Sequence, residues 1–218
     1  MFVNGNSQGA PSIHTEYIYQ NGVVTKIITS TRVYDLFYDA QQRMIAANIA
    51  AEGKYYRFQH LPSNIVYFEK ITLPYDNPNL QVFRRYILKF DADDNIIEYG
   101  NDINLNGIVS NNKIITYANG DKVQIQNPNG TIENFSFSSV INNFNILQFN
   151  SFGKRNRNIF NSECIALEGY DYFSKHISQE DLATDTYEVL PNGFYSKKTE
   201  TYSTDSHNTE SVTEFFFE

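Results

Sequence analysis

The sequence predicts an all-β protein: an antiparallel meander of successive hairpins that forms one large twisted or curled sheet, with at most one or two short helices. Three observations support this fold class. Short segments alternate apolar and polar residues with the period of a strand. Asn-Gly and Asp-rich corners separate these segments. The chain contains 17 Phe and 16 Tyr, and aromatic residues favour the pleated, half-buried surface of a sheet.

The corners are spaced so that each segment can pair with the next one. The clearest corner is Asn21-Gly22, because both residues tolerate a positive φ. Further corners are predicted at 38–44, 90–96, 117–121, 126–131, 149–154, 190–194 and 202–208. The segments 23–31, 65–73, 82–90, 114–117, 123–126, 132–137 and 211–218 are predicted strands. Loops this short join neighbouring strands in antiparallel pairs.

The remaining segments complete the domain plan. Residues 1–12 are predicted to form a flexible polar leader, and 13–218 a single β-meander domain. The Ala-rich stretch 46–53 lies between tyrosines and is predicted to be a hairpin. The acidic turn after Ser178 predicts one short helix. The Asn-rich segment 101–112 and the basic run 154–157 are expected to be loops.

Charge and cysteine content argue against several kinds of partner, covalent link and architecture. A net charge of −8 and a pI near 5.0 argue against a nucleic-acid partner, which requires a cationic surface. Cys164 is the sole cysteine, which excludes an intramolecular disulfide and a thiolate metal cluster. A membrane-spanning barrel is the alternative architecture. The outward-facing rows of such a barrel would have to be continuously apolar across the bilayer. The charged residues in the predicted strand regions argue against this architecture: Lys26, Arg32, Lys70, Lys89, Lys122 and Glu133.

One local pattern points to a family. In 37–58 the pairs Tyr38-Asp39, Arg43-Met44 and Tyr55-Tyr56, together with Gly53, occupy the places of the YD repeat, which this segment resembles. Gln42 stands where that repeat has Gly, so we expect a wider turn.

A second resemblance concerns the C-terminal part. Segments 185–202 and 209–218 look like the ending of uncharacterised surface lipoproteins of the Bacteroidetes type, and 150–177 looks like their middle region. The resemblance implies an extracytoplasmic β-protein at the outer membrane or cell surface, held by a lipid anchor outside this chain. It implies no catalytic residues. We also expect a monomer.

A candidate calcium loop begins at Asp102. Asp102, Asn104 and Asn106 supply oxygen atoms at positions 1, 3 and 5, and Gly107 follows at the sharp turn. Lys113 stands where such a loop needs a bidentate acid, so affinity would be low unless Asp91, Asp93 or Asp94 contributes. The alternative is an Asn-rich turn whose side chains bind their own backbone. We expect no other cofactor.

No motif predicts catalysis. The segment 151–154 is a Ser-x-x-Lys match within a turn, and the four histidines are scattered without metal-ligand spacing. Carboxylates that could pair only in space are Glu98, Asp102, Glu163 and Asp171.

The sequence thus favours a non-catalytic binding or scaffold module that contacts an extracellular glycan or peptide. Two alternatives are a hydrolase acting on an extracellular polymer and a structural fragment of a larger YD-repeat shell.

Overall fold

The main sheet follows the order of the chain. The computed structural model describes residues 2–5, 13–29, 31–143, 153–164, 174–179, 185–204 and 207–214. Within them a 15-stranded sheet has the order β12 back to β1, followed by β17, β16 and β15. Every pairing is antiparallel. The predicted fold class, an antiparallel meander with few and short helices, is confirmed.

The strands of this sheet are β1 (Phe2–Gly5), β2 (Ile13–Gln20), β3 (Val23–Thr29), β4 (Val33–Tyr38), β5 (Met44–Ile49), β6 (Lys54–Leu61), β7 (Ile65–Ile71), β8 (Val82–Phe90), β9 (Ile96–Asn101), β10 (Ser110–Ala118), β11 (Asp121–Gln126), β12 (Ile132–Asn134), β15 (Asp185–Val189), β16 (Tyr195–Thr204) and β17 (His207–Glu214). A second, two-stranded sheet contains β13 (Phe137–Ile141) and β14 (His176–Ser178). The helical elements are the 3₁₀ turn η1 (Ala50–Glu52) and the helix α2 (Lys154–Cys164).

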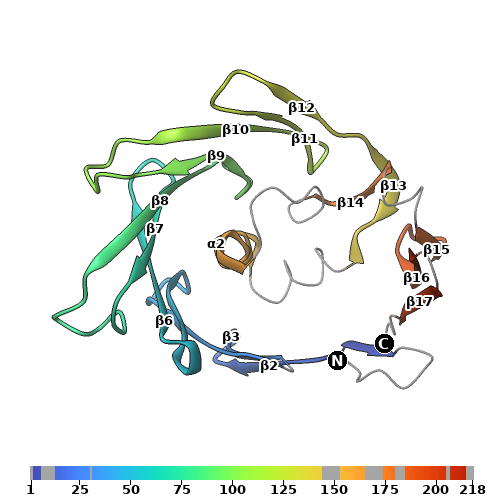
Figure 1. Cartoon of the computed structure of the whole chain (residues 1–218), viewed down its shortest axis with the longest axis horizontal. Coiled ribbons are helices and arrows are strands. Elements are labelled where there is room, and N and C mark those ends of the chain that lie inside the picture. The colour runs from blue at the N-terminus through green and yellow to red at the C-terminus, as the bar shows by residue number, and fades with distance from the viewer. Residues whose placement is uncertain are drawn as a thin grey trace.

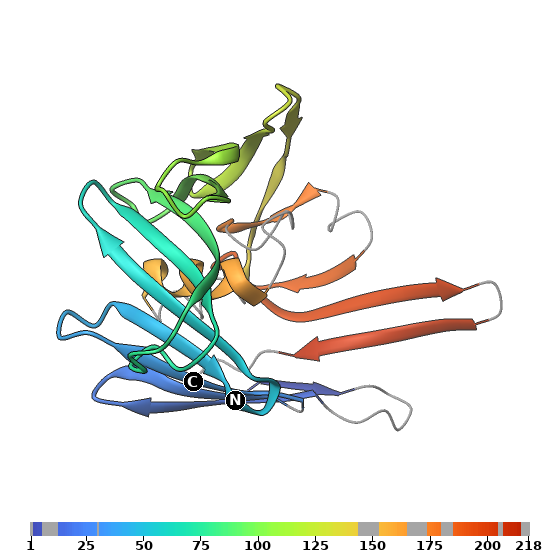
Figure 2. The ribbon, with the colours of Figure 1, turned by 60° about the vertical axis from the view of Figure 1, so that its left-hand side comes forward.

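The sheet curls into a ring around α2 (Figure 1). β1 pairs with both β2 and β17, so the first and last strands lie side by side and the two termini are close together. The β13–β14 ribbon lies across the remaining gap. It is tied by hydrogen bonds from the Lys175 N–H to the Gly120 carbonyl at 3.0 Å and from the Ile141 N–H to the Gly193 carbonyl at 2.9 Å. Figure 2 shows β16 and β17 as a long hairpin that reaches beyond the rest of the ring.

The first part of the predicted leader differs from the expectation, and most of the predicted short helix is not described. Residues 2–5 of the predicted 1–12 leader form β1, because β2 and β17 both offer their backbone groups to it; residues 6–12 lie outside the described part of the chain. Ser178 ends β14, and most of the helix predicted after it lies outside the described residues as well. The predicted 46–53 hairpin is confirmed, with η1 as its connection.

The predicted strand 132–137 is split between β12 and β13, which belong to different sheets. The corners predicted at 149–154 and 202–208, and the end of the predicted strand 211–218, lie partly outside the described residues. Within the described residues no helix combines the length and the apolar character that crossing a membrane requires.

The inside of the ring contains a large apolar cluster. Alternate residues of β3 to β11 point inward, as the period of two predicts, and form one buried cluster with Ile159 of α2. Phe160 packs edge-on against Tyr34, with ring centres 5.3 Å apart. The cluster comprises Val24, Ile27, Tyr34, Leu36, Met44, Ala47, Ile49, Tyr56, Phe58, Val66, Phe68, Leu88, Phe90, Ile96, Tyr99, Ile115, Ile125 and Ile159.

One five-residue turn recurs at 39–43, 91–95, 127–131 and 190–194. In each, the first residue's N–H donates to the fifth residue's carbonyl, and the fourth residue's N–H donates to the first residue's carbonyl. The fourth residue has a left-handed backbone: φ is 59° at Gln42, 60° at Asp94, 83° at Gly130 and 86° at Gly193. Four of the corners predicted from the sequence therefore share one form, whereas Asn21-Gly22 and Asn119-Gly120 are turns with two consecutive left-handed residues.

The expectation of a wider turn at Gln42 is wrong. Gln42 adopts the left-handed conformation that Gly would take more easily, at a cost of roughly 1–2 kcal/mol. The turn keeps its shape because Asp39 Oδ1 accepts hydrogen bonds from the N–H groups of Gln41 and Arg43, at 3.0 and 2.9 Å. The Asp of the YD pair thus stabilises the turn without a glycine.

The expectation that the basic run 154–157 is a solvated loop is also wrong. The run begins α2, and Asn156 and Arg157 are buried inside the ring. Asn156 Nδ2 donates to the Gln42 carbonyl and its Oδ1 accepts from the Met44 N–H, both at 2.9 Å. Asn156 of the run therefore binds a hairpin turn, whereas the sequence suggested that the run would be hydrated.

A second turn holds the same helix. Arg155 Nε donates to Asp94 Oδ1 at 2.6 Å, and Asn158 Nδ2 donates to the Asp94 carbonyl at 2.8 Å. Asp94 and Gln42 are the fourth residues of their turns, so α2 is anchored at the same place in two copies of the repeated turn.

The sequence suggested that Lys122 faces outward, but its side chain is buried. The β10–β11 register shifts near Thr116 and Tyr117, and such a bulge reverses the side-chain alternation. Lys122 is fully buried with its Nζ 5.6 Å from the centre of the Phe135 ring. Burial lowers the pKa of its ammonium group to about 8, against the attraction of Glu133.

Candidate functional site

The candidate calcium loop lies between β9 and β10 and is folded over the outer face of the ring. Asp102 is buried, while Asn104 and Asn106 are exposed. Asp102 Oδ1 accepts a hydrogen bond from the Asn106 N–H at 3.0 Å, and Oδ2 accepts one from the Gly107 N–H at 2.9 Å. Asn106 Oδ1 accepts from the Ile108 N–H at 3.0 Å. These are contacts of side chains with their own loop backbone.

The Asp102 carboxylate also forms an ion pair with Arg85 of β8. Arg85 Nη1 donates to Asp102 Oδ2 at 3.0 Å and to the Leu105 carbonyl at 3.1 Å. Burial by itself would raise the pKa of the Asp102 carboxyl, but the hydrogen bonds from Gly107 and Arg85 outweigh it and hold that pKa below its ordinary value. A calcium ion at this carboxylate would have to displace or repel the guanidinium group of Arg85.

Two of the acids that could have joined such a site, Asp91 and Asp94, have partners elsewhere. Asp91 Oδ1 accepts hydrogen bonds from the N–H groups of Asp93 and Asn95 within its own turn. Asp94 pairs with Arg155 of α2. Among the described residues, no group of three or more His, Cys, Asp or Glu side chains is placed to share a metal ion.

The calcium hypothesis stays testable by titration. Because Arg85 and two backbone N–H groups occupy the Asp102 oxygens, we expect isothermal calorimetry with CaCl2 to give the same flat trace for the wild type and for Asp102→Ala. A saturating heat in the wild type that is lost in Asp102→Ala would establish a calcium site.

Arg85 belongs to a chain of charges that crosses three strands. Glu69 of β7 is completely buried between Arg57 of β6 and Arg85 of β8. Arg57 Nε donates to Glu69 Oε2 at 2.6 Å, and Arg85 Nε donates to Glu69 Oε1 at 2.8 Å. Gln59 Nε2 adds a longer bond to Oε2 at 3.2 Å. Together with Asp102, these residues fix the 102–109 loop against the sheet.

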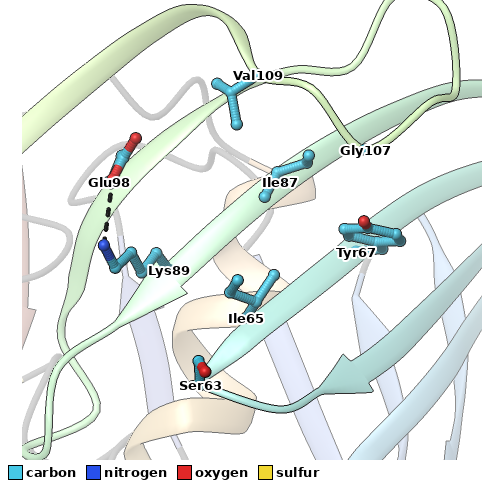
Figure 3. A pocket seen from close by; sticks show the side chains of 8 residues that line it. All are labelled: Ser63, Ile65, Tyr67, Ile87, Lys89, Glu98, Gly107 and Val109. Atoms are coloured by element: carbon cyan, nitrogen blue, oxygen red, sulfur yellow. Dashed lines mark ion pairs between the residues drawn. The ribbon is translucent and has the colours of Figure 1, made fainter.

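The fixed loop roofs a pocket of about 300 Å³ on the outer face. Its floor residues alternate with members of the buried cluster such as Val66, Phe68 and Leu88, so they point away from α2. Figure 3 shows α2 behind the strands and the pocket side chains in front. The pocket is lined by Ser63, Ile65, Tyr67, Ile87, Lys89, Glu98, Gly107 and Val109.

The pocket combines apolar walls with one pair of opposite charges. Ile65, Tyr67, Ile87 and Val109 form the apolar part. Lys89 Nζ lies 3.6 Å from Glu98 Oε2, which is longer than a hydrogen bond.

At Gly107 the backbone of the 102–109 loop closely approaches the Tyr67 side chain. The φ of Gly107 is +82°, and a Cβ added there would lie 2.9 Å from the Tyr67 hydroxyl oxygen. Both the left-handed backbone and the close approach therefore favour glycine at this position.

The sequence singled out Glu98 and Asp102 as carboxylates that could meet in space. The structure gives them different surroundings, with Glu98 in the pocket and Asp102 buried against Arg85. The Glu163 side chain and Asp171 lie outside the described part. Sequence reasoning missed the pocket itself, whose one local signal is the long loop after Asn101.

No family model matches the chain, and no curated protein matches it. Among solved structures, the chain is similar to a porin-like protein from Bacteroides uniformis, with 11% sequence identity and a TM-score of 0.33. The alignment covers 91% of this chain and 92% of that one. This similarity transfers no residue role and no activity.

Proposed function

We propose that this protein is a non-catalytic binding module of an exported, lipid-anchored surface protein, and that the outer pocket is its binding site. The observation that carries the proposal is the pocket itself: an apolar concavity with two convergent charges, held open by a loop that a buried ion-pair chain fixes. Ligand sites commonly combine apolar walls with a few placed polar groups. Export and anchorage rest on the YD-like and lipoprotein-like sequence segments.

Inside the ring, the described inward-pointing apolar side chains pack into one cluster. This cluster includes Ile159 of α2, and Phe160 packs against it. A hydrolase of extracellular polymers would need two convergent carboxylates or a metal in a cleft. In the outer pocket Glu98 is the one carboxylate. Recognition without turnover is therefore the function that this pocket suits.

Filling the pocket tests the proposal. We expect the wild type to bind selected members of a glycan and peptide array, and Ile65→Trp to lose this binding at least tenfold because the indole occupies the cavity. Val33→Trp is the matched control, since Val33 is an aliphatic residue at the start of β4, 41% exposed and away from the pocket. It should bind as the wild type does.

Three outcomes would contradict the proposal. These are no selective binding by the wild type, equal binding by the wild type and Ile65→Trp, and time-dependent release of cleaved product from a bound spot. The last result would favour the hydrolase alternative.

A further inference from the structure

We propose that the outer pocket binds the C-terminal residue of a peptide whose last side chain is apolar. The inference rests on the proposed function and deepens it. The terminal carboxylate pairs with Lys89, the backbone N–H of the last residue donates to Glu98, and the side chain lies among Ile65, Ile87 and Val109.

The charges in the pocket favour a carboxylate. Glu98 Oε1 already accepts a hydrogen bond from Asn112 Nδ2 at 3.0 Å. Lys89 faces Glu98 at 3.6 Å, beyond hydrogen-bond reach, and its side chain is 49% exposed. Lys89 is thus a cation at the pocket mouth that can gain a charge-assisted hydrogen bond without breaking one.

The pair also suits the geometry of a chain end. A lone carboxylate would gain from Lys89 but be repelled by Glu98 beside it. The last residue of a peptide carries a carboxylate and an N–H donor on the same Cα, so it can satisfy the cation and the anion together. Both groups of the pair then have a partner of the correct kind.

The pocket walls argue against a sugar. Sugars stack on flat aromatic faces, and Tyr67 is the aromatic residue among those that line the pocket. The Arg85 guanidinium carbon lies over that ring, 4.6 Å from its centre. The other walls are branched aliphatic side chains, which are shaped to hold a side chain such as that of leucine or isoleucine.

Three probes and one charge-removing variant test the inference. The probes are an N-acetylated peptide ending in leucine, the same peptide with a C-terminal amide, and the same peptide ending in aspartate. By calorimetry or fluorescence anisotropy, we expect the leucine acid to bind the wild type at least tenfold more tightly than either of the others. Lys89→Met should reduce binding of the acid to the level of the amide and leave the amide unchanged.

Lys26→Met is the matched control. Lys26 is a partly exposed lysine paired with Asp35, on β3 and outside the pocket, and its loss should leave all three affinities unchanged. Equal binding of the leucine acid and the amide, or tighter binding of the peptide that ends in aspartate, would overturn the inference. If Ile65→Trp still removes the array binding of the wild type in that case, the pocket remains a ligand site and the proposed function stands.

Discussion

Glu69→Gln should lower the free energy of unfolding by about 3 kcal/mol, one of the two largest effects expected in this protein. The carboxylate is fully buried and receives hydrogen bonds from Arg57, Arg85 and Gln59. An amide of the same shape removes the charge and turns an NH2 group toward a guanidinium. The cost lies at the low end for a buried ion pair, because the side chains of Arg57 and Arg85 are 26% and 14% exposed and gain some solvation.

Urea denaturation followed by circular dichroism measures this effect as a shift of the midpoint at constant slope. Glu16→Gln is the matched control, an exposed Glu on β2, and should change the free energy by less than about 0.5 kcal/mol. Equal stability of Glu69→Gln and wild type would mean that the ion-pair chain does not hold the loop. Weaker peptide binding by Glu69→Gln would be expected as a consequence, since the loop forms the pocket roof.

Asn156→Leu should destabilise the protein by about 2–4 kcal/mol. Leu has nearly the same volume but leaves the Met44 N–H and the Gln42 carbonyl without the partner that Asn156 supplies. An unpaired group costs roughly 1–3 kcal/mol where it is buried, as the Met44 N–H is, and the less buried Gln42 carbonyl adds a smaller part. The anchor between α2 and the 39–43 turn is then lost, although Arg155 and Asn158 still bind Asp94.

Hydrogen exchange provides a local readout that a general loss of stability does not. The Met44 amide should exchange faster in Asn156→Leu, by more than amides in β7 and β8 do. Asn79→Leu, the same substitution at an exposed loop position, should leave both exchange and stability unchanged. Unaltered protection of Met44 in Asn156→Leu would show that the side chain does not carry the anchor.

Much of the meander could be predicted because its information is local. The Asp39 turn, for example, is built from hydrogen bonds among residues 39–43, and the alternation around it follows from the strand period alone. The pairing of β1 with β17 has no such local signal. Phe2–Gly5 reads as a polar leader until its partner at the other end of the chain is known.

The site could be predicted only in part for the same reason. Asp102, Asn104 and Asn106 were correctly placed in one turn, but Arg85 is a residue of another strand and no spacing connects it to Asp102. Asn156 and Arg157 look like solvated residues because their polarity is visible in the sequence and their buried partners are not. Ile65 and Ile87 form a pocket only because the 102–109 loop covers the face on which they lie.

The pairing of β1 with β17 also limits how the sheet can associate with other copies of the protein. In the described sheet, β12 and β15 are the two strands with a single neighbour. Both are short, and they carry the acids Glu133, Asp185 and Glu188. Short, charged borders resist the intermolecular strand pairing that leads to aggregates, and the net charge of −8 adds repulsion between copies. Because β1 and β17 pair with each other, neither presents the edge that faces the other for pairing with a second molecule.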